Sequence, residues 1–405
     1  MMPNITKYTL NSIGFYFLFP MYFATACLFV FFNVPVSFYW GIFALLAIIT
    51  IPTLIMNKIF PLDLNLQNSY DVVQKKQKFR FIILLFSATV IFAGFLDIYI
   101  NGLKLLNPST YAKLNGNGRY VRHISMLCWI LIPVAFIFLR TWKVRAFFVA
   151  YAFLFPILII DRNRLFLSFY SFIVCFLLSF RSLESSKKKG IVVLSISCMM
   201  VFSLVLFAAI GKFRVGKPFA VRSSGTLLIK NQYPLTKAFT HLPASTSQAV
   251  MYITSPIFNF ATIAAADFRN PQFLLNQLAP FSKEHSSFYP YAPVLISGFN
   301  IGTEFYPFLL YGGLSLVLCS FVLMLLTVVL FSFLFKKSPN IFTYIIFIKL
   351  SYGALFLGFG PQFFILYNLM VILLMLSLWG GAVSVDKLSK KYWIPKRKIE
   401  LTNAF

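Results

Sequence analysis

Ten stretches of continuous apolar sequence, most of them near 20 residues long, constrain this chain more than any other feature. A helix that crosses a bilayer needs about 20 apolar residues, so each stretch is expected to form one. Hydrophobic residues make up 59% of the chain and charged residues 11%, whereas soluble domains carry about 25% charged residues, which excludes a water-soluble fold. We therefore expect an all-α polytopic membrane protein with helices near 11–32, 38–57, 81–101, 124–140, 146–161, 165–181, 190–210, 306–335, 341–360 and 362–383.

The spacing of these stretches divides the chain into four parts: 1–210 with seven predicted helices, the long segment 211–304, 305–383 with three predicted helices, and the basic tail 384–405. The long segment is the one large region without a continuous apolar run. Within it, the sequences SQAVMYITSPIFNFATIAAA and NPQFLLNQLAPF are half apolar and are expected to form helices along the membrane surface. A capping box from Ser245 to Gln248 is predicted at the start of the first.

The positions of Lys and Arg predict the orientation. The net charge of +26 comes largely from cations that flank apolar runs, as the enrichment of Lys and Arg in cytoplasmic loops predicts, so nucleic acid is not an expected partner. The densely basic short loops place both termini in the cytoplasm and 211–304 outside. The first apolar run lacks a small-residue cleavage site and is expected to act as an uncleaved anchor.

Three groups of cations nevertheless fall on the outer side. Guanidinium groups suit bidentate capture of phosphate, so these groups favour an anionic ligand. The alternative is that long loops cross the membrane regardless of charge, which accounts for the third group alone. The groups are Lys104, Lys113, Arg119 and Arg122; Arg162 and Arg164; and Lys212, Arg214, Lys217, Arg222, Lys230, Lys237, Arg269 and Lys283.

Two of these groups are candidate phosphate sites. Arg162 and Arg164 lie at the tip of a predicted hairpin, where a charge costs about 2.5–3.5 kcal/mol on insertion scales. Arg164 begins the returning helix, whose N-terminus favours a phosphate; the alternative is a topogenic charge balanced by Asp161. The stretch GKFRVGKPFAVRSSG combines glycines with cations and suits a pyrophosphate, although it is not a Walker motif. Its alternative is an exposed basic stretch; its candidate ligands are Arg214, Lys217 and Arg222.

A general base must be a His, Asp or Glu within reach of the acceptor hydroxyl. Glu304, Asp267 and His285 are the candidates on the outer side. In GFNIGTEFYPFLLYGG, Asn300 or Thr303 would be an ordinary N-cap and Glu304 an ordinary first-turn acid. No His, Cys or acid spacing typical of a metal site occurs, so no metal or cofactor is expected.

In layout the chain resembles the bacterial O-antigen polymerases of the Wzy type, which share a GT-C-like architecture with the O-antigen ligases. The residues that carry the resemblance are Arg164-Leu165-Phe166-Leu167, Arg214, Arg222, the segment YITSPIFNF at 252–260, Asn300-Ile301-Gly302-Thr303-Glu304-Phe305 and Tyr311-Gly312-Gly313. The ligases place a histidine at the loop exit, where this chain has Asn300. That difference favours a polymerase over a ligase.

The resemblance implies a metal-independent inverting glycosyltransferase of the bacterial cytoplasmic (inner) membrane, with the large loop in the periplasm. Its donor would be a glycan on undecaprenyl pyrophosphate, its acceptor the non-reducing end of a new lipid-linked repeat unit, and its partners membrane lipids and a chain-length regulator. Ligation and lipid-linked oligosaccharide transport are the alternatives. A transporter should carry charged residues within its membrane spans, and Lys349 is a charged residue of this kind. The implied pyrophosphate ligands are Arg162, Arg164, Arg214, Arg222 and Lys217, the glycan ligands Arg269, Asn300, Thr303, Tyr252 and Tyr289, and the catalytic candidates Glu304, His285 and Asp267.

Overall fold

The computed structural model describes residues 12–59, 66–110, 118–179, 205–206, 209–210, 235–278 and 302–392. In these ranges the chain is almost entirely helical, and the one extended pairing is an isolated bridge between Phe32 and Leu235. Seven helices of the described chain are long and apolar enough to cross a membrane. The predicted class, an all-α polytopic membrane protein, agrees with this architecture. The predicted helix at 190–210 lies almost wholly outside the described residues.

The first four helices follow the predicted pattern, with one addition. The structure has α2 (Ile13–Phe31), α3 (Val36–Ile59), α4 (Leu66–Lys76) and α5 (Arg80–Asn101). The addition is α4, whose sequence LQNSYDVVQKK is too polar for a span but buries Tyr70 and Val73. A short 3-10 turn, η1 (Pro108–Thr110), follows α5.

The predicted helix at 124–140 is built from three consecutive pieces. These are α6 (Gly118–Ser125), the 3-10 segment η2 (Met126–Ile130) and α7 (Leu131–Phe138). Together, 118–138 is long and apolar enough to span. The next two helices, α8 (Trp142–Leu158) and α9 (Arg162–Ser179), pack against each other and are joined by three residues. The tight hairpin predicted at DRNR is therefore confirmed.

Helices form within 211–304 as predicted, but the first long one packs among other helices of the protein. The structure has α11 (Lys237–Thr240), α12 (Ala244–Ala266) and α13 (Pro271–Leu278). Helix α12 packs against α2, α3 and α14, and 249–266 is itself long and apolar enough to cross a membrane. Gly41 of α3 allows this approach, because a Cβ there would lie 3.0 Å from the Cβ of Ala264. The helix begins at Ala244 after Pro243, so the capping box predicted from Ser245 was wrong.

Three helices complete the fold: α14 (Tyr306–Lys337), α15 (Ile341–Leu355) and α16 (Leu366–Tyr392). Helix α14 bends at Gly313, whose φ of 72° lies in the left-handed region that glycine tolerates. Helix α15 starts with a capping box between Asn340 and Thr343. It ends five residues earlier than predicted, so 356–365 forms an irregular connector to α16.

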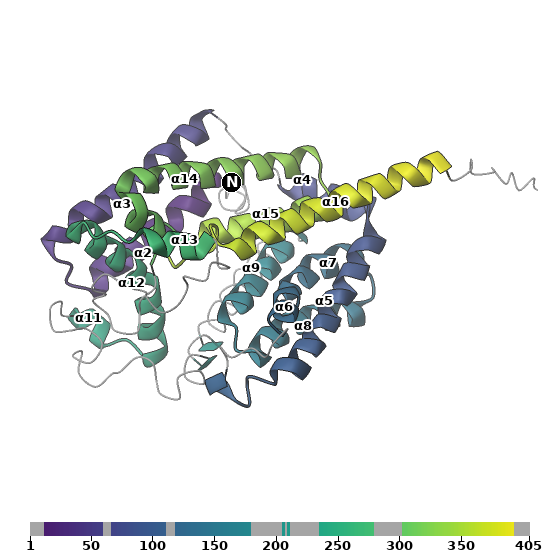
Figure 1. The fold of residues 1–405 in the computed structure, drawn as a ribbon, viewed down its shortest axis with the longest axis horizontal. Helices are drawn as coiled ribbons and strands as arrows, with labels where there is room; N and C mark the ends of the chain where they lie inside the picture. Colours follow the sequence, from purple (N-terminus) through teal and green to yellow (C-terminus); the bar gives the residue numbers. More distant parts are fainter. Residues whose placement is uncertain are drawn as a thin grey trace, which may run out of the picture.

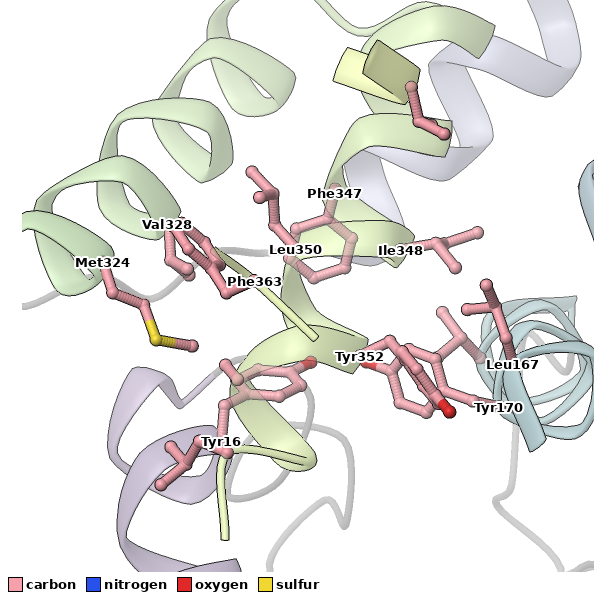
Figure 2. Close-up of a cluster of buried hydrophobic side chains, with 14 of the residues drawn as sticks. Tyr16, Leu167, Tyr170, Met324, Val328, Phe347, Ile348, Leu350, Tyr352 and Phe363 are labelled. Carbon is pink, nitrogen blue, oxygen red and sulfur yellow. The ribbon is translucent and has the colours of Figure 1, made fainter. Parts of the chain in front are cut away.

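Helix α15 lies at the centre of the arrangement. Figure 1 shows α2, α3, α12 and α14 on one side and α5 to α9 on the other, with α15 between them and α16 extending away from the body. Every residue of α15 from Ile341 to Ala354 is buried. Figure 2 shows the core around α15, where Phe347, Ile348, Leu350 and Tyr352 of this helix lie among side chains of α2, α9, α14 and the connector: Tyr16, Leu167, Tyr170, Met324, Val328 and Phe363.

Candidate functional site

The turn between α8 and α9 presents the two arginines of the predicted hairpin. Ile160 is buried and has a φ of 58°, a strained value for a β-branched residue. Directly after it, Asp161 Oδ1 accepts a hydrogen bond of 3.1 Å from the backbone N–H of Arg164, as an N-terminal cap does. The strained turn and its cap together set the direction in which α9 begins.

Arg164 is buried at the start of α9, with 7% of its surface exposed. Its guanidinium carbon lies 4.1 Å from the ring centre of Tyr367, Nη2 lies 3.3 Å from Met126 Sδ, and Nε lies 3.8 Å from Asp161 Oδ2. Within the described part of the chain, Nη1 has no hydrogen-bond partner. A buried charged donor without an acceptor is costly, so the site is suited to an incoming anion.

Arg162 connects the same turn to α12. Its Nη2 donates a 3.0 Å hydrogen bond to the hydroxyl of Tyr252, and its guanidinium carbon lies 5.0 Å from the centre of that ring. Tyr252 and Arg162 belong to two different predicted ligand groups, separated by 90 positions in the chain. The structure therefore brings together Arg162 and Tyr252, two of the residues that the sequence analysis selected, while Arg164, two positions further along α9, contacts Tyr367 and Met126.

Asn163, between the two arginines, binds the irregular connector. Its Nδ2 donates to Gln362 Oε1 at 3.0 Å, and its Oδ1 accepts from the Tyr352 hydroxyl at 2.7 Å. Sequence analysis did not single out Asn163, Gln362 or Tyr352. Amides and tyrosines beside apolar runs are common, so the sequence contains no signal that joins these positions.

Glu304 has a different place from the one predicted. Helix α14 begins at Tyr306 with Phe305 as its N-cap and no side-chain cap, so the ordinary alternatives, Thr303 as a cap and Glu304 as a first-turn acid, do not describe these residues. The Glu304 carboxylate is fully buried and accepts backbone hydrogen bonds from Gln362 (2.5 Å), Phe363 (2.9 Å) and Phe364 (2.8 Å).

Burial raises the pKa of the Glu304 carboxyl, while the three amides and the positive charge of Lys349 act in the opposite direction. Thr303 is also fully buried, and its hydroxyl has no hydrogen-bond partner among the described residues. Both side chains face the protein interior, so a bulky glycan can reach them less easily than it can reach Tyr252.

Two further residues of the site were not among the predicted ligands. Lys349 of α15 is fully buried, interacts electrostatically with Arg164 and Glu304, and has its Nζ 5.5 Å from the ring centre of Tyr352. Its sequence signal was a lone Lys inside an apolar run, which typically marks a functional position in a membrane protein. His123 of α6 is exposed, and its ring centre lies 6.3 Å from that of Tyr367.

Asp267 and Arg269 pair with each other away from this cluster. Arg269 Nη2 lies 2.5 Å from Asp267 Oδ1, and the two side chains are 41% and 83% exposed, respectively. Asp267 ends α12, fifteen positions after Tyr252, which corresponds to about 22 Å of helical rise. The structure therefore does not bring this candidate base and this candidate glycan ligand to the arginines of α9.

A second buried cluster accounts for part of the outer cation surplus. Arg122 Nε lies 2.6 Å from Asp97 Oδ2, which also accepts a 2.6 Å hydrogen bond from Ser125. Asn101 donates to Asp97 Oδ1 at 2.7 Å. One cation of the first outer group is thus neutralised within the protein and joins α5 to α6, which weakens the case for an anion at that place.

The remaining predicted ligands lie outside the described residues: Arg214, Lys217, Arg222, His285, Tyr289 and Asn300. Across the described ranges, no three His, Cys, Asp or Glu side chains gather so that they could hold a metal ion.

Fold and site together define a class: an all-α polytopic membrane protein in which Arg164 at the start of α9 and Lys349 of α15 are buried cations that interact electrostatically. Comparison with known proteins does not narrow this class. No family model, no curated protein sequence and no solved structure matches the chain.

Proposed function

We propose that this protein is a membrane-embedded glycosyltransferase that polymerises lipid-linked oligosaccharide repeat units, with Arg164 and Arg162 binding the diphosphate of the donor. One observation carries the proposal: the buried guanidinium of Arg164 has an unsatisfied Nη1 donor among the described residues and interacts electrostatically with the buried Lys349. The two carboxylates nearby are already engaged, Asp161 with the start of α9 and Glu304 with three amides. Arg162, Arg164 and Lys349 outnumber these two carboxylates, and an excess of cations favours an anionic ligand.

The chemistry follows from the charge that develops during transfer. The acceptor hydroxyl oxygen attacks the anomeric carbon, the bond from that carbon to the diphosphate oxygen breaks, and the diphosphate leaves with the electron pair. Fixed cations in a water-poor site stabilise that developing charge more strongly than they would in water. Tyr252, held by Arg162, offers a ring face for a sugar next to the leaving group. In-line attack inverts the anomeric centre.

The hydroxyl proton needs an acceptor, and Glu304, Asp267 and His285 stay the candidates. Glu304 accepts three backbone hydrogen bonds, and Asp267 is paired with Arg269 far along α12. These engagements favour a reaction driven by positioning of the two substrates; His285 lies outside the described residues.

The proposed setting is the bacterial inner membrane, with both termini in the cytoplasm and 211–304 in the periplasm. Support comes from the long apolar helices of the described chain that lie outside 211–304 and from the basic short loops. The donor and acceptor would both be undecaprenyl-pyrophosphate-linked glycans, and a chain-length regulator would be a further partner.

Replacement of Arg164 tests the proposal. Purified protein in liposomes with lipid-linked repeat units should elongate them, and Arg164→Ala should abolish elongation because the diphosphate loses its main ligand. Arg164→Lys should retain a small part of the activity, since lysine keeps the charge and loses the two-pronged donor geometry. Arg80→Ala is the matched control, because Arg80 is an exposed arginine at the start of α5. Normal chain lengths with Arg164→Ala would contradict the assignment.

A second candidate function is transport of the lipid-linked oligosaccharide. The fully buried Lys349 favours it, because ionisable groups inside membrane proteins mark transport pathways. The same liposomes separate the two: translocation of the labelled lipid without elongation would indicate a transporter. Elongation by the purified protein alone would indicate a polymerase.

A ligase would give a different result in cells. After deletion of the gene, long lipid-linked polymer would accumulate without attachment to the lipid A core.

A further inference from the structure

We infer that Glu304 is a positioning residue: it holds the connector 356–365 so that Gln362 binds Asn163 and thereby orients the two arginines at the start of α9. The functional importance of that orientation rests on the proposed function, whereas the mechanical coupling does not. The inference assigns Glu304 a role other than that of general base.

The first step is the grip of Glu304 on the connector. Three successive backbone N–H groups, those of Gln362, Phe363 and Phe364, converge on its two oxygens. These amides belong to an irregular segment between α15 and α16, so no helix supplies their acceptors. Buried backbone donors need partners, and one carboxylate provides all three. Glu304 is itself anchored, because its N–H donates to the carbonyl of Leu357 at 2.8 Å.

The second step runs from the connector to α9. The backbone of Gln362 is bound by Glu304, and its side chain accepts a 3.0 Å hydrogen bond from Asn163. Asn163 is held from its other side by the Tyr352 hydroxyl. Since Asn163 lies between Arg162 and Arg164 in the first turn of α9, its position determines the directions in which both guanidinium groups leave the helix.

The third step explains why a carboxylate is required. Its two oxygens accept three hydrogen bonds, whereas a glutamine presents one oxygen and one NH₂ donor. A glutamine would therefore place a donor against either Phe364 N–H or the pair from Gln362 and Phe363. Protonation of Glu304 would weaken these bonds, because hydrogen bonds to an ionised carboxylate are stronger than those to a neutral acid.

Amide hydrogen exchange read by mass spectrometry tests the coupling in the full-length protein in detergent. Glu304→Ala and Glu304→Gln should speed exchange about tenfold in two separate peptides, 356–368 and 159–170, since a buried donor loses its partner. Gln362→Ala leaves the three backbone bonds to Glu304 in place. It should therefore speed exchange in 159–170 and leave the amides of Phe363 and Phe364 protected. Gln362→Glu keeps an acceptor for Asn163 and should restore protection.

The outcomes separate this inference from the proposed function. Faster exchange confined to 356–368 in the Glu304 variants, with 159–170 unchanged, would overturn the positioning role whatever the activity. If Glu304 variants loosen 159–170 while Arg164→Ala elongates normally, the positioning role stands and the proposed function fails. Under both proposals, elongation by Gln362→Ala falls and Gln362→Glu recovers it, a pattern that a general base at Glu304 would not produce.

Discussion

Removing one partner of the buried Asp97–Arg122 ion pair should destabilise the protein strongly. The two side chains are 0% and 6% exposed, so water does not screen the charge that is left behind. Breaking a buried pair from one side costs about 3–5 kcal/mol. Asp97→Asn and Arg122→Met should each lower the free energy of unfolding by about that amount. In Asp97→Asn the hydrogen bond from Ser125 also loses its charged acceptor.

The double variant shows whether the loss of stability comes from an unpaired buried charge. Replacing both members of a buried pair is often neutral or stabilising, so Asp97→Asn combined with Arg122→Met should recover most of the loss. The expected coupling energy is about 3 kcal/mol, measured by equilibrium unfolding in mixed detergent micelles. The matched control is the exposed pair Asp267–Arg269, whose coupling should be at most about 1 kcal/mol. Additive single losses at Asp97 and Arg122 would refute the reasoning.

Two further variants test packing and charge elsewhere. Gly41→Ala should cost about 1–3 kcal/mol of unfolding free energy, because its Cβ would lie 3.0 Å from Ala264 of α12. Gly380→Ala meets no atom within 4 Å and should not destabilise; equal effects would contradict the close packing. Burial and then the charge of Arg122 lower the pKa of Lys104, so the folded state binds that proton less readily than the unfolded chain. Stability should therefore rise with pH toward about 10.5, and Lys104→Met should remove that rise in a melting series.

The arginines at the start of α9 were predictable from the sequence, whereas most of their contacts were not. Arg162 and Arg164 stand out because charge interrupts two apolar runs, a contrast visible within a few residues. Tyr252 was selected for a sugar and lies against Arg162. Lys349 was visible as a charge within a span, yet nothing in the sequence shows that it faces Arg164 and Glu304. Tyr367, under the guanidinium of Arg164, had no signal at all.

The structure differs from the prediction at two segments, α12 and the residues before α14, whose packing depends on neighbouring helices. The first half-apolar stretch of 211–304 forms α12, which lies among α2, α3 and α14. Half-apolar sequence is compatible with a surface helix and with a helix whose less apolar face meets protein, so composition does not distinguish them. Helix α14 starts at Tyr306, as predicted, but the carboxylate of Glu304 just before it binds the connector and does not complement the first turn of the helix.

By itself, the sequence determined the class of the protein, most of its helices, the hairpin between α8 and α9 and the charge of its tip, because hydropathy and local charge act over about one helix length. Only the tertiary structure decided which polar groups meet. Glu304 binds amides 58 to 60 positions away, and Asn163 binds Gln362 across 199 positions. Such contacts arise from how helices pack around α15, and packing depends on the shapes of many side chains at once.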